Sequence, residues 1–145
     1  MADSSNIDQA IVAMLGADAT LLGYMPNGVF FDEAPPGSTR FVIVSLIDEV
    51  DEAVFGGRAF EDYSYLVKAV ALSTAGGNLK EAAARIDALL EDQPIGLGSP
   101  ISVDGYGWMA CHRERRVRYT EVDEGDPSLR WRHRGGEYRV QMALT

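Results

Sequence analysis

The segment Tyr63–Ser73 constrains the fold of this 145-residue chain more than any other feature. It is rich in aromatic and β-branched residues, which are typical of a strand. Successive side chains of a strand point to opposite faces. Tyr63 and Tyr65 therefore share one face, and Leu66 and Val70 share the other. Because both faces are apolar, the segment predicts a central strand or one that is covered on both sides.

Three other segments have the composition of strands, and an acidic, turn-forming stretch at 122–128 separates the last two as a hairpin tip would. The segment Asp51–Phe60, with two glycines in its middle, is expected to be a mobile connection. A short edge strand is expected at Val29–Phe31, within a stretch rich in proline and glycine. The three expected long strands are Phe41–Val50, Trp108–Glu121 and Leu129–Ala143.

Two segments, 5–15 and 78–92, carry apolar residues at helical spacing along one face. A further short helical turn is expected at 18–24. The length suits one domain over residues 1–145. The order of the main elements then predicts an α+β fold: a two-layer domain in which two helices pack on one face of a four-stranded, mainly antiparallel sheet.

Charge is unevenly distributed along the chain, whose net charge is −9. Residues 1–92 hold 15 acids and 5 bases, whereas residues 93–145 hold 7 acids and 8 bases. This asymmetry fits complementary surfaces on copies of one chain, and it also fits an acidic protein with one arginine-rich sheet edge. A net negative charge disfavours tight binding to nucleic acid. The single cysteine excludes an internal disulfide and fits a reducing cytoplasm.

The search for catalytic or metal-binding residues returns weak candidates only. Cys111 and His112 are adjacent, so on a strand their side chains would point to opposite faces. His112 and His133 could be cross-strand neighbours, but no third metal ligand is evident. The acids at 48, 49, 51 and 52 lack the spacing of a calcium loop and are expected to be a solvated acidic segment or a surface that meets an arginine. No catalytic, cofactor-binding or metal-binding residue is therefore predicted.

Arginines are the most distinctive polar feature of the chain. Four lie on each of the last two expected strands, and alternation places those at 130, 132 and 134 on one face. Arginine is favoured at protein interfaces because its planar fork binds carboxylates in pairs. An exposed polar face, with cross-strand pairs to Glu114 or Glu137, explains the same pattern. The candidate self-association residues are Arg113, Arg115, Arg130, Arg132 and Arg134.

Several segments occur in a characteristic order along the chain. They are the helix ending at Leu15-Gly16, Gly28–Gly37 with its Ala34-Pro35-Pro36-Gly37, Phe41–Val44, Tyr65–Ala69, the helix Glu81–Leu90, and Arg132–Val140 with its His133-Arg134-Gly135-Gly136-Glu137-Tyr138-Arg139-Val140. This ordered pattern resembles the tail terminator, or tail completion, family of long-tailed bacteriophages and gene transfer particles. Arg40 departs from the pattern, since many members have proline before the aromatic residue.

The resemblance implies a virion structural protein without an active site or cofactor. Members form a ring, usually a hexamer, that caps the tail tube, stops its polymerisation and provides the docking surface for the head connector. The implied partners are copies of the chain, the tail tube protein and the head connector or stopper protein. DNA would pass through the lumen without specific binding, and no membrane is involved. The implied location is the neck-proximal end of the virion tail, after assembly in the bacterial cytoplasm.

Charged loops are where contacts with the tube and the connector would lie. Two alternatives stay open at this point: a head–tail connector or other neck protein, and a small Cys/His hydrolase or ligand-binding domain that uses Cys111 or His112. The residues expected in partner-docking loops are Asp51, Glu52, Phe55, Arg58, Asp123, Glu124 and Asp126.

Overall fold

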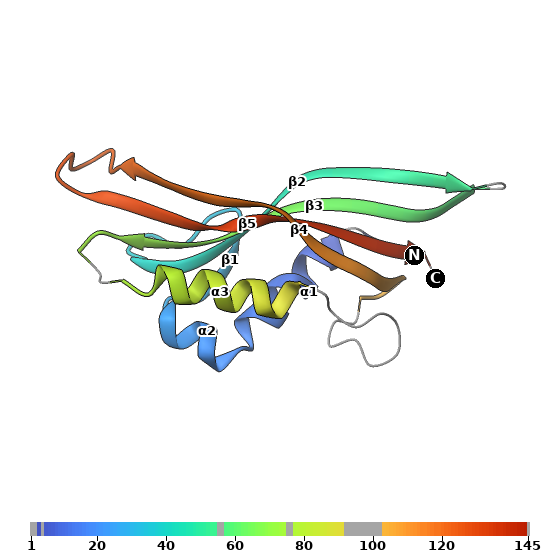
Figure 1. Cartoon of the computed structure of the whole chain (residues 1–145), viewed down its shortest axis with the longest axis horizontal. Helices are drawn as coiled ribbons and strands as arrows, with labels where there is room; N and C mark the ends of the chain where they lie inside the picture. The colour runs from blue at the N-terminus through green and yellow to red at the C-terminus, as the bar shows by residue number, and fades with distance from the viewer. Residues whose placement is uncertain (1–2, 4, 55–56, 75–76, 92–102, 145) are drawn as a thin grey trace.

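A computed structural model describes residue 3 and residues 5–54, 57–74, 77–91 and 103–144 of the chain. Figure 1 shows a long, twisted sheet with helices below one of its faces. Within the described ranges, no helix combines the length and apolar character that crossing a bilayer requires. The elements are α1 (Ser5–Gly16), α2 (Ala19–Tyr24), β1 (Val29–Phe31), β2 (Arg40–Val54), β3 (Gly57–Leu72), α3 (Leu79–Leu90), β4 (Tyr106–Val122) and β5 (Arg130–Leu144).

The sheet has five strands in the order β1-β2-β3-β5-β4. The short edge strand β1 pairs in parallel with β2, and all other pairs are antiparallel. The expected α+β class is confirmed, but the sheet has one strand more than the four that the sequence predicted. The difference comes from Val29–Phe31, whose pairing with Val42–Val44 makes it a strand of the sheet.

The central position predicted for Tyr63–Ser73 is confirmed, because β3 lies between β2 and β5. Only one of its faces is covered by helices. Tyr65 and Val67 are fully buried there against Ile11 and Ile86, in one core built from α1, α2, α3 and the sheet. The opposite face carries Val70, and none of the described helices covers it (Figure 1).

The connection expected at Asp51–Phe60 is instead part of the sheet at its described residues, 51–54 and 57–60, with a register shift between Glu52 and Ala53. Strand β2 continues to Val54 and β3 begins at Gly57, with Val54 paired to Gly57. The two strands make a long hairpin that extends beyond the helices (Figure 1). We call residues 47–62 of this hairpin the acidic arm, because they hold six acids and one base. The sequence prediction failed here because charged residues and glycine reduce strand propensity, whereas pairing with a neighbouring strand restores it.

The register shows that the acidic arm and the β4–β5 hairpin point in opposite directions. Phe60, near the tip of the acidic arm, pairs with Ala143 at the end of β5. Leu72, at the far end of β3, pairs with Trp131 beside the β4–β5 turn. The molecule is therefore elongated, with one hairpin projecting at each end (Figure 1).

Glycine at position 135 allows β3 and β5 to approach closely. A Cβ atom at Gly135 would lie 2.1 Å from the backbone oxygen of Val67 and 2.5 Å from the Cα of Lys68. Both are backbone atoms of β3, so a side chain at position 135 would force the two strands apart. The Gly135-Gly136 pair is thus needed for strand packing inside β5 and does not mark a turn.

Candidate interaction surfaces

Cys111 and His112 do not form a catalytic pair. The Cys111 side chain is fully buried in the core below the sheet, whereas His112 is exposed. They point to opposite faces of β4, as strand alternation predicts. A buried thiol in apolar surroundings is a poor nucleophile because burial disfavours the thiolate.

The two histidines are not cross-strand neighbours, contrary to the arrangement considered from the sequence. His112 pairs with Arg139, and His133 pairs with Tyr119, whose ring stacks on the imidazole at a centroid distance of 4.3 Å. The Nε2 atom of His133 lies 2.5 Å from a carboxylate oxygen of Glu121. Among the described residues, no three His, Cys, Asp or Glu side chains gather as a metal site would require.

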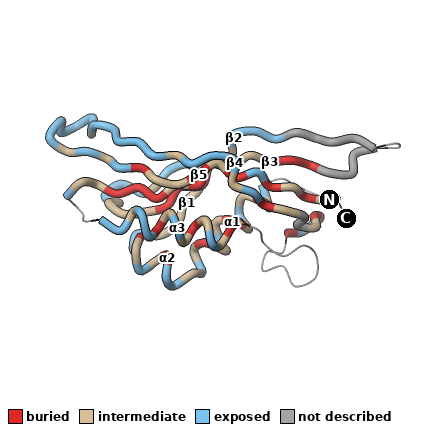
Figure 2. The backbone as a smooth tube through the Cα atoms, viewed as in Figure 1, coloured by how far each residue is buried: buried red, intermediate tan, exposed pale blue. Residues whose placement is uncertain are grey.

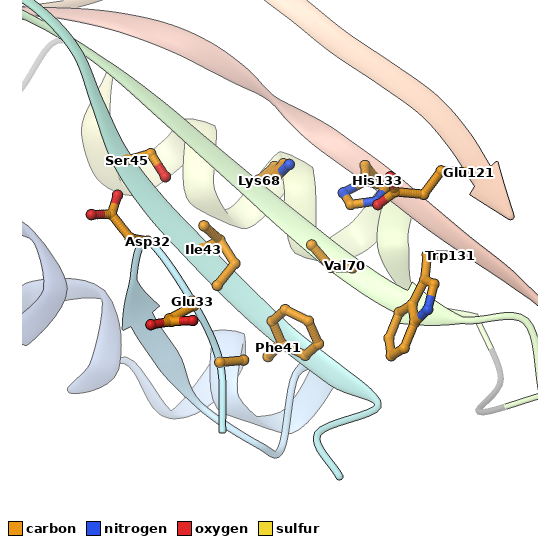
Figure 3. Close-up of a pocket in the computed structure, with 11 residues that line it drawn as sticks. Asp32, Glu33, Phe41, Ile43, Ser45, Lys68, Val70, Glu121, Trp131 and His133 are labelled. Atoms are coloured by element: carbon orange, nitrogen blue, oxygen red, sulfur yellow. The ribbon is translucent and has the colours of Figure 1, made fainter. Parts of the chain in front are cut away.

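His133 belongs to a shallow pocket of about 320 Å³ on the face of the sheet that the helices leave open. Figure 3 shows Ile43 and Val70 at its floor, with Phe41 and Trp131 at one end. The rings of Phe41 and Trp131 lie 6.0 Å apart in a tilted arrangement. The two rings lie beside the aliphatic side chains of the floor and shield them from water. The open face therefore buries Ile43 and Val70 with side chains of the sheet itself.

The pKa of His133 is lowered by its burial and, next, by the nearby charge of Lys68, although the hydrogen bond with Glu121 acts in the opposite direction. Its Nδ1 atom is buried and has no hydrogen-bond partner within the described part of the chain. A protonated ring would bury a second N–H donor at Nδ1 without a partner, which disfavours the charged form. Burial and the unpaired Nδ1 therefore both favour the neutral ring.

The arginines of β4 and β5 divide between the two faces of the sheet. Arg115 forms an ion pair of 2.9 Å with Glu137 on the open face. Arg113 lies on the helix side, where it pairs at 2.7 Å with Asp87 of α3. Arg134 pairs across the sheet with Ala69, which faces the helices, so its side chain lies on the helix side too. The candidate self-association residues thus do not form one continuous surface.

A second pocket, of about 400 Å³, lies between α3 and the helix-facing side of β4 and β5. We call it the basic pocket, because four of its cations, Lys80, Arg116, Arg118 and Arg134, have no ion pair within the described part of the chain. Its one acid, Asp87, already binds Arg113 and accepts a hydrogen bond of 3.0 Å from Tyr138.

Sequence reasoning named Arg134 but missed Lys80, Arg116 and Arg118. Only the packing of α3 beside β4 brings Lys80 to residues that lie some 36 or more positions later in the chain. The available signal was the run of basic residues at 115, 116 and 118, which on its own is equally typical of a solvated strand face.

Two of the expected docking acids stabilise the β4–β5 turn. Asp123 accepts a hydrogen bond of 2.8 Å from the indole nitrogen of Trp131 and two more from the backbone amides of Gly125 and Asp126. The bond from Trp131 is the largest cause of the lowered pKa of Asp123. Asp126 binds the hydroxyl and amide of Ser128, which lower its pKa. Asp126 and Glu124 are both exposed, whereas Asp123 is half-buried.

The other expected docking residues lie on the acidic arm. Asp51, Glu52 and Arg58 belong to strands β2 and β3 and not to a loop, and Phe55 lies outside the described residues. The arm's first two acids, Asp48 and Glu49, are exposed. The outer part of the β4–β5 hairpin is exposed as well (Figure 2).

The fold is similar to that of known structures. A chain from the virion of a native gene transfer agent particle matches with a TM-score of 0.62 and 21% identity, over 97% of this chain and 96% of that one. A second solved structure, which carries no functional description, matches with a TM-score of 0.55 and 12% identity over 100% and 97%. No protein-family model and no curated protein matches the chain. At these identities the likeness establishes the fold.

Proposed function

We propose that this chain is a structural subunit of a phage-type virion tail. Copies of it form a ring, most simply a hexamer, that caps the tail tube, stops tube polymerisation and provides the docking surface for the head connector. The observation that carries the proposal is the near-complete fold match to a chain of a gene transfer agent virion. The ordered sequence resemblance to tail terminator proteins supports the same role.

The surfaces of the molecule are consistent with assembly. The basic pocket and the exposed acids of the acidic arm lie on opposite parts of an elongated chain, which suits contacts between identical subunits. The arginines at 113, 115, 130, 132 and 134 are the proposed self-association set. The proposed contacts with the tube and the connector are Arg58, near the tip of the acidic arm, and Asp123, Glu124 and Asp126 in the β4–β5 turn.

A neck position is the second candidate, because the matched chain is described only as part of a whole virion particle. A hydrolase role has no comparable support, since Cys111 is buried at 0% exposure and away from His112. The proposed role is structural, and it places the chain in the virion at the neck-proximal end of the tail, after assembly in the host cytoplasm.

The test combines mass measurement in solution, negative-stain imaging and co-sedimentation with tail tubes. We expect rings of one chain type, or rings that form at the ends of tubes and stop their growth. Binding to head connectors without binding to tubes would favour the neck position. A monomer that binds neither would contradict both assignments.

Charge reversal provides a second readout of the same proposal. The double variant Arg132→Glu/Arg134→Glu should weaken self-assembly and leave the fold intact, because Arg132 is exposed and Arg134 lies at a partly exposed pocket wall. Sedimentation measures assembly, and circular dichroism checks the fold. Unchanged assembly would remove these arginines from the self-association set.

A further inference from the structure

The basic pocket is a concentrated positive site that the chain does not neutralise from within. Among the described residues, its charged lining comprises five cations and the single carboxylate of Asp87. That carboxylate is occupied by Arg113 and Tyr138, which leaves Lys80, Arg116, Arg118 and Arg134 without an acidic partner in the described part of the chain. Like charges this close repel one another, so the pocket is more stable when an anionic group enters it.

The walls of the basic pocket favour a carboxylate ligand. Arginine presents a planar fork that binds carboxylate or phosphate through two parallel hydrogen bonds. Three of the four unpaired cations are arginines, and they come from adjacent strands, with Arg118 directly opposite Arg134 in the register. Val117 and the alanines of α3 line the space between them. This combination of arginine forks and apolar lining suits the carboxylates of a short acidic segment.

The acidic arm supplies such a segment. Asp48 and Glu49 are exposed, and Asp51 and Glu52 follow in the same strand, so residues 48–52 hold four carboxylates and no base. The arm cannot reach its own basic pocket. Asp48 pairs with Ser64, five residues along β3 from the Ala69 that pairs with Arg134, a separation of about 17 Å at the rise of a strand.

The positions of the two features suit a head-to-tail contact. The acidic arm projects from one end of the sheet, and α3 lies below the half that is nearer the β4–β5 hairpin (Figure 1). Helix α3 supplies Lys80, Ala83, Ala84 and Asp87 to the basic pocket. When one patch of a chain binds a different patch of the next copy, the contact repeats, and it closes into a ring when the rotation between copies is a whole fraction of a turn; otherwise it builds an open filament. Opposite charges on the two patches would steer the subunits and fix their order.

We propose that the basic pocket binds the acidic arm of a neighbouring copy of the same chain, with residues 48–52 of one subunit against Lys80, Arg116, Arg118 and Arg134 of the next. The inference rests on the proposed ring of identical subunits and assigns its contact. Double-stranded DNA is the competing occupant. The net charge of −9 and the acidic segment within reach of a second copy favour the protein contact.

The test uses two charge-reversed variants of the full chain. The pocket variant is Arg116→Glu/Arg118→Glu and the arm variant is Asp48→Lys/Glu49→Lys, and all four positions are exposed, so the fold should survive. Each variant alone should lose self-association by about tenfold or more in sedimentation equilibrium at low salt. Mixed in equal amounts they should regain it, because each acidic arm then meets a basic pocket and each basic arm meets an acidic pocket.

A matched pair of single variants separates the pocket from general charge effects. Arg116→Glu removes a cation of the basic pocket, whereas Arg115→Glu makes the same change at the adjacent residue on the opposite face. We expect a clear loss of association for Arg116→Glu and a smaller loss for Arg115→Glu. Equal losses would overturn the pocket contact and leave the wider arginine set of the proposed function in place.

Three other outcomes would also overturn the inference. These are failure of the mixed variants to associate, a wild-type chain that stays monomeric at the highest concentration reached, and binding of a double-stranded DNA oligonucleotide that disappears in the pocket variant while self-association does not change. None of them removes the proposed function, because a ring that forms only on tail tubes would still bind and cap them. Loss of tube binding by the wild-type chain is the result that contradicts the function itself.

Discussion

The two faces of the sheet exclude water in different ways. On one face, three helices cover Tyr65 and Val67 and form a continuous core. On the other face, Ile43 and Val70 are only 6% and 2% exposed, yet no helix lies over them. Their cover comes from side chains of the sheet itself, among them Phe41 and Trp131 (Figure 3). The comparison shows that low exposure alone does not identify a second layer.

The two faces are expected to respond differently to mutation. The helix-covered core has close-packed neighbours on every side, so a deleted methyl group leaves a cavity. The open face has half-exposed neighbours that can move into a gap. We therefore expect mutations of equally buried residues to be more costly on the helix side, and we expect the open face to tolerate change as long as no partner binds there.

The largest effect should come from the centre of the helix-covered core. Ile86→Ala removes a fully buried side chain between α3 and the sheet and should lower the free energy of unfolding by about 2–5 kcal/mol. The control is Ile47→Ala, since Ile47 is half exposed and should change stability by less than about 0.5 kcal/mol. Chemical denaturation monitored by circular dichroism measures both. Similar losses in the two variants would contradict a core located under α3.

A matched pair on β3 tests the comparison directly. Val67 and Val70 are both buried, but Val67 faces the helices and Val70 faces the open pocket. Val67→Ala should cost about 2–3 kcal/mol, whereas Val70→Ala should cost about 1 kcal/mol, because Phe41 and Trp131 can settle into the space. Denaturant midpoints of the two variants measure the two losses of stability. A larger loss for Val70→Ala would show that the open face is as tightly packed as the core.

The smallest expected effect concerns pH and the open face. The pKa of His133 is lowered in the folded chain, so the unfolded chain binds more protons between that pKa and the ordinary value of about 6.5. Stability from the neutral ring is then fully present above about pH 6.5 and is lost as the pH falls toward the folded pKa. His133→Gln should remove this loss from thermal unfolding profiles recorded between pH 7 and 5.

The variant Glu121→Gln gives a second test of the role of His133 in the acid response. Glu121 is the group that favours a protonated His133, so its removal should steepen the loss of stability on acidification. An unchanged profile in both variants would show that His133 does not control the acid response of the fold.

Helix α3 and strand β3 could be predicted from local sequence, because the spacing of their apolar residues matches the faces that are buried in the structure. The amphipathic pattern of 78–92 became α3, with Asp92 outside the described residues, and the two-sided apolar pattern of Tyr63–Ser73 became the central strand β3. The acidic arm was missed because its charged and glycine residues resemble a connection when read alone. Its two strands pair with each other as a hairpin, and β3 also pairs with β5, which lies far along the chain.

The candidate interaction residues were predictable only in part. The excess of arginine in the last third of the chain is a property of the sequence, and it correctly draws attention to β4 and β5. Alternation could not tell which face meets α3, because a register irregularity between Arg113 and Arg115 shifts the pattern along β4. It also could not reveal that Asp123 and Asp126 are engaged in bonding the turn.

The sequence by itself determined the class of the fold, the central strand, the positions of the main helices and the division between an acidic body and an arginine-rich end. These follow from local periodicity and from charge counts, which need no knowledge of distant contacts. Only the tertiary structure decided which arginines share a pocket with Lys80, which acids project on the acidic arm and which face of the sheet stays open. The reason is physical: a pocket is made by elements far apart in the chain, and its charge depends on which groups have already found partners.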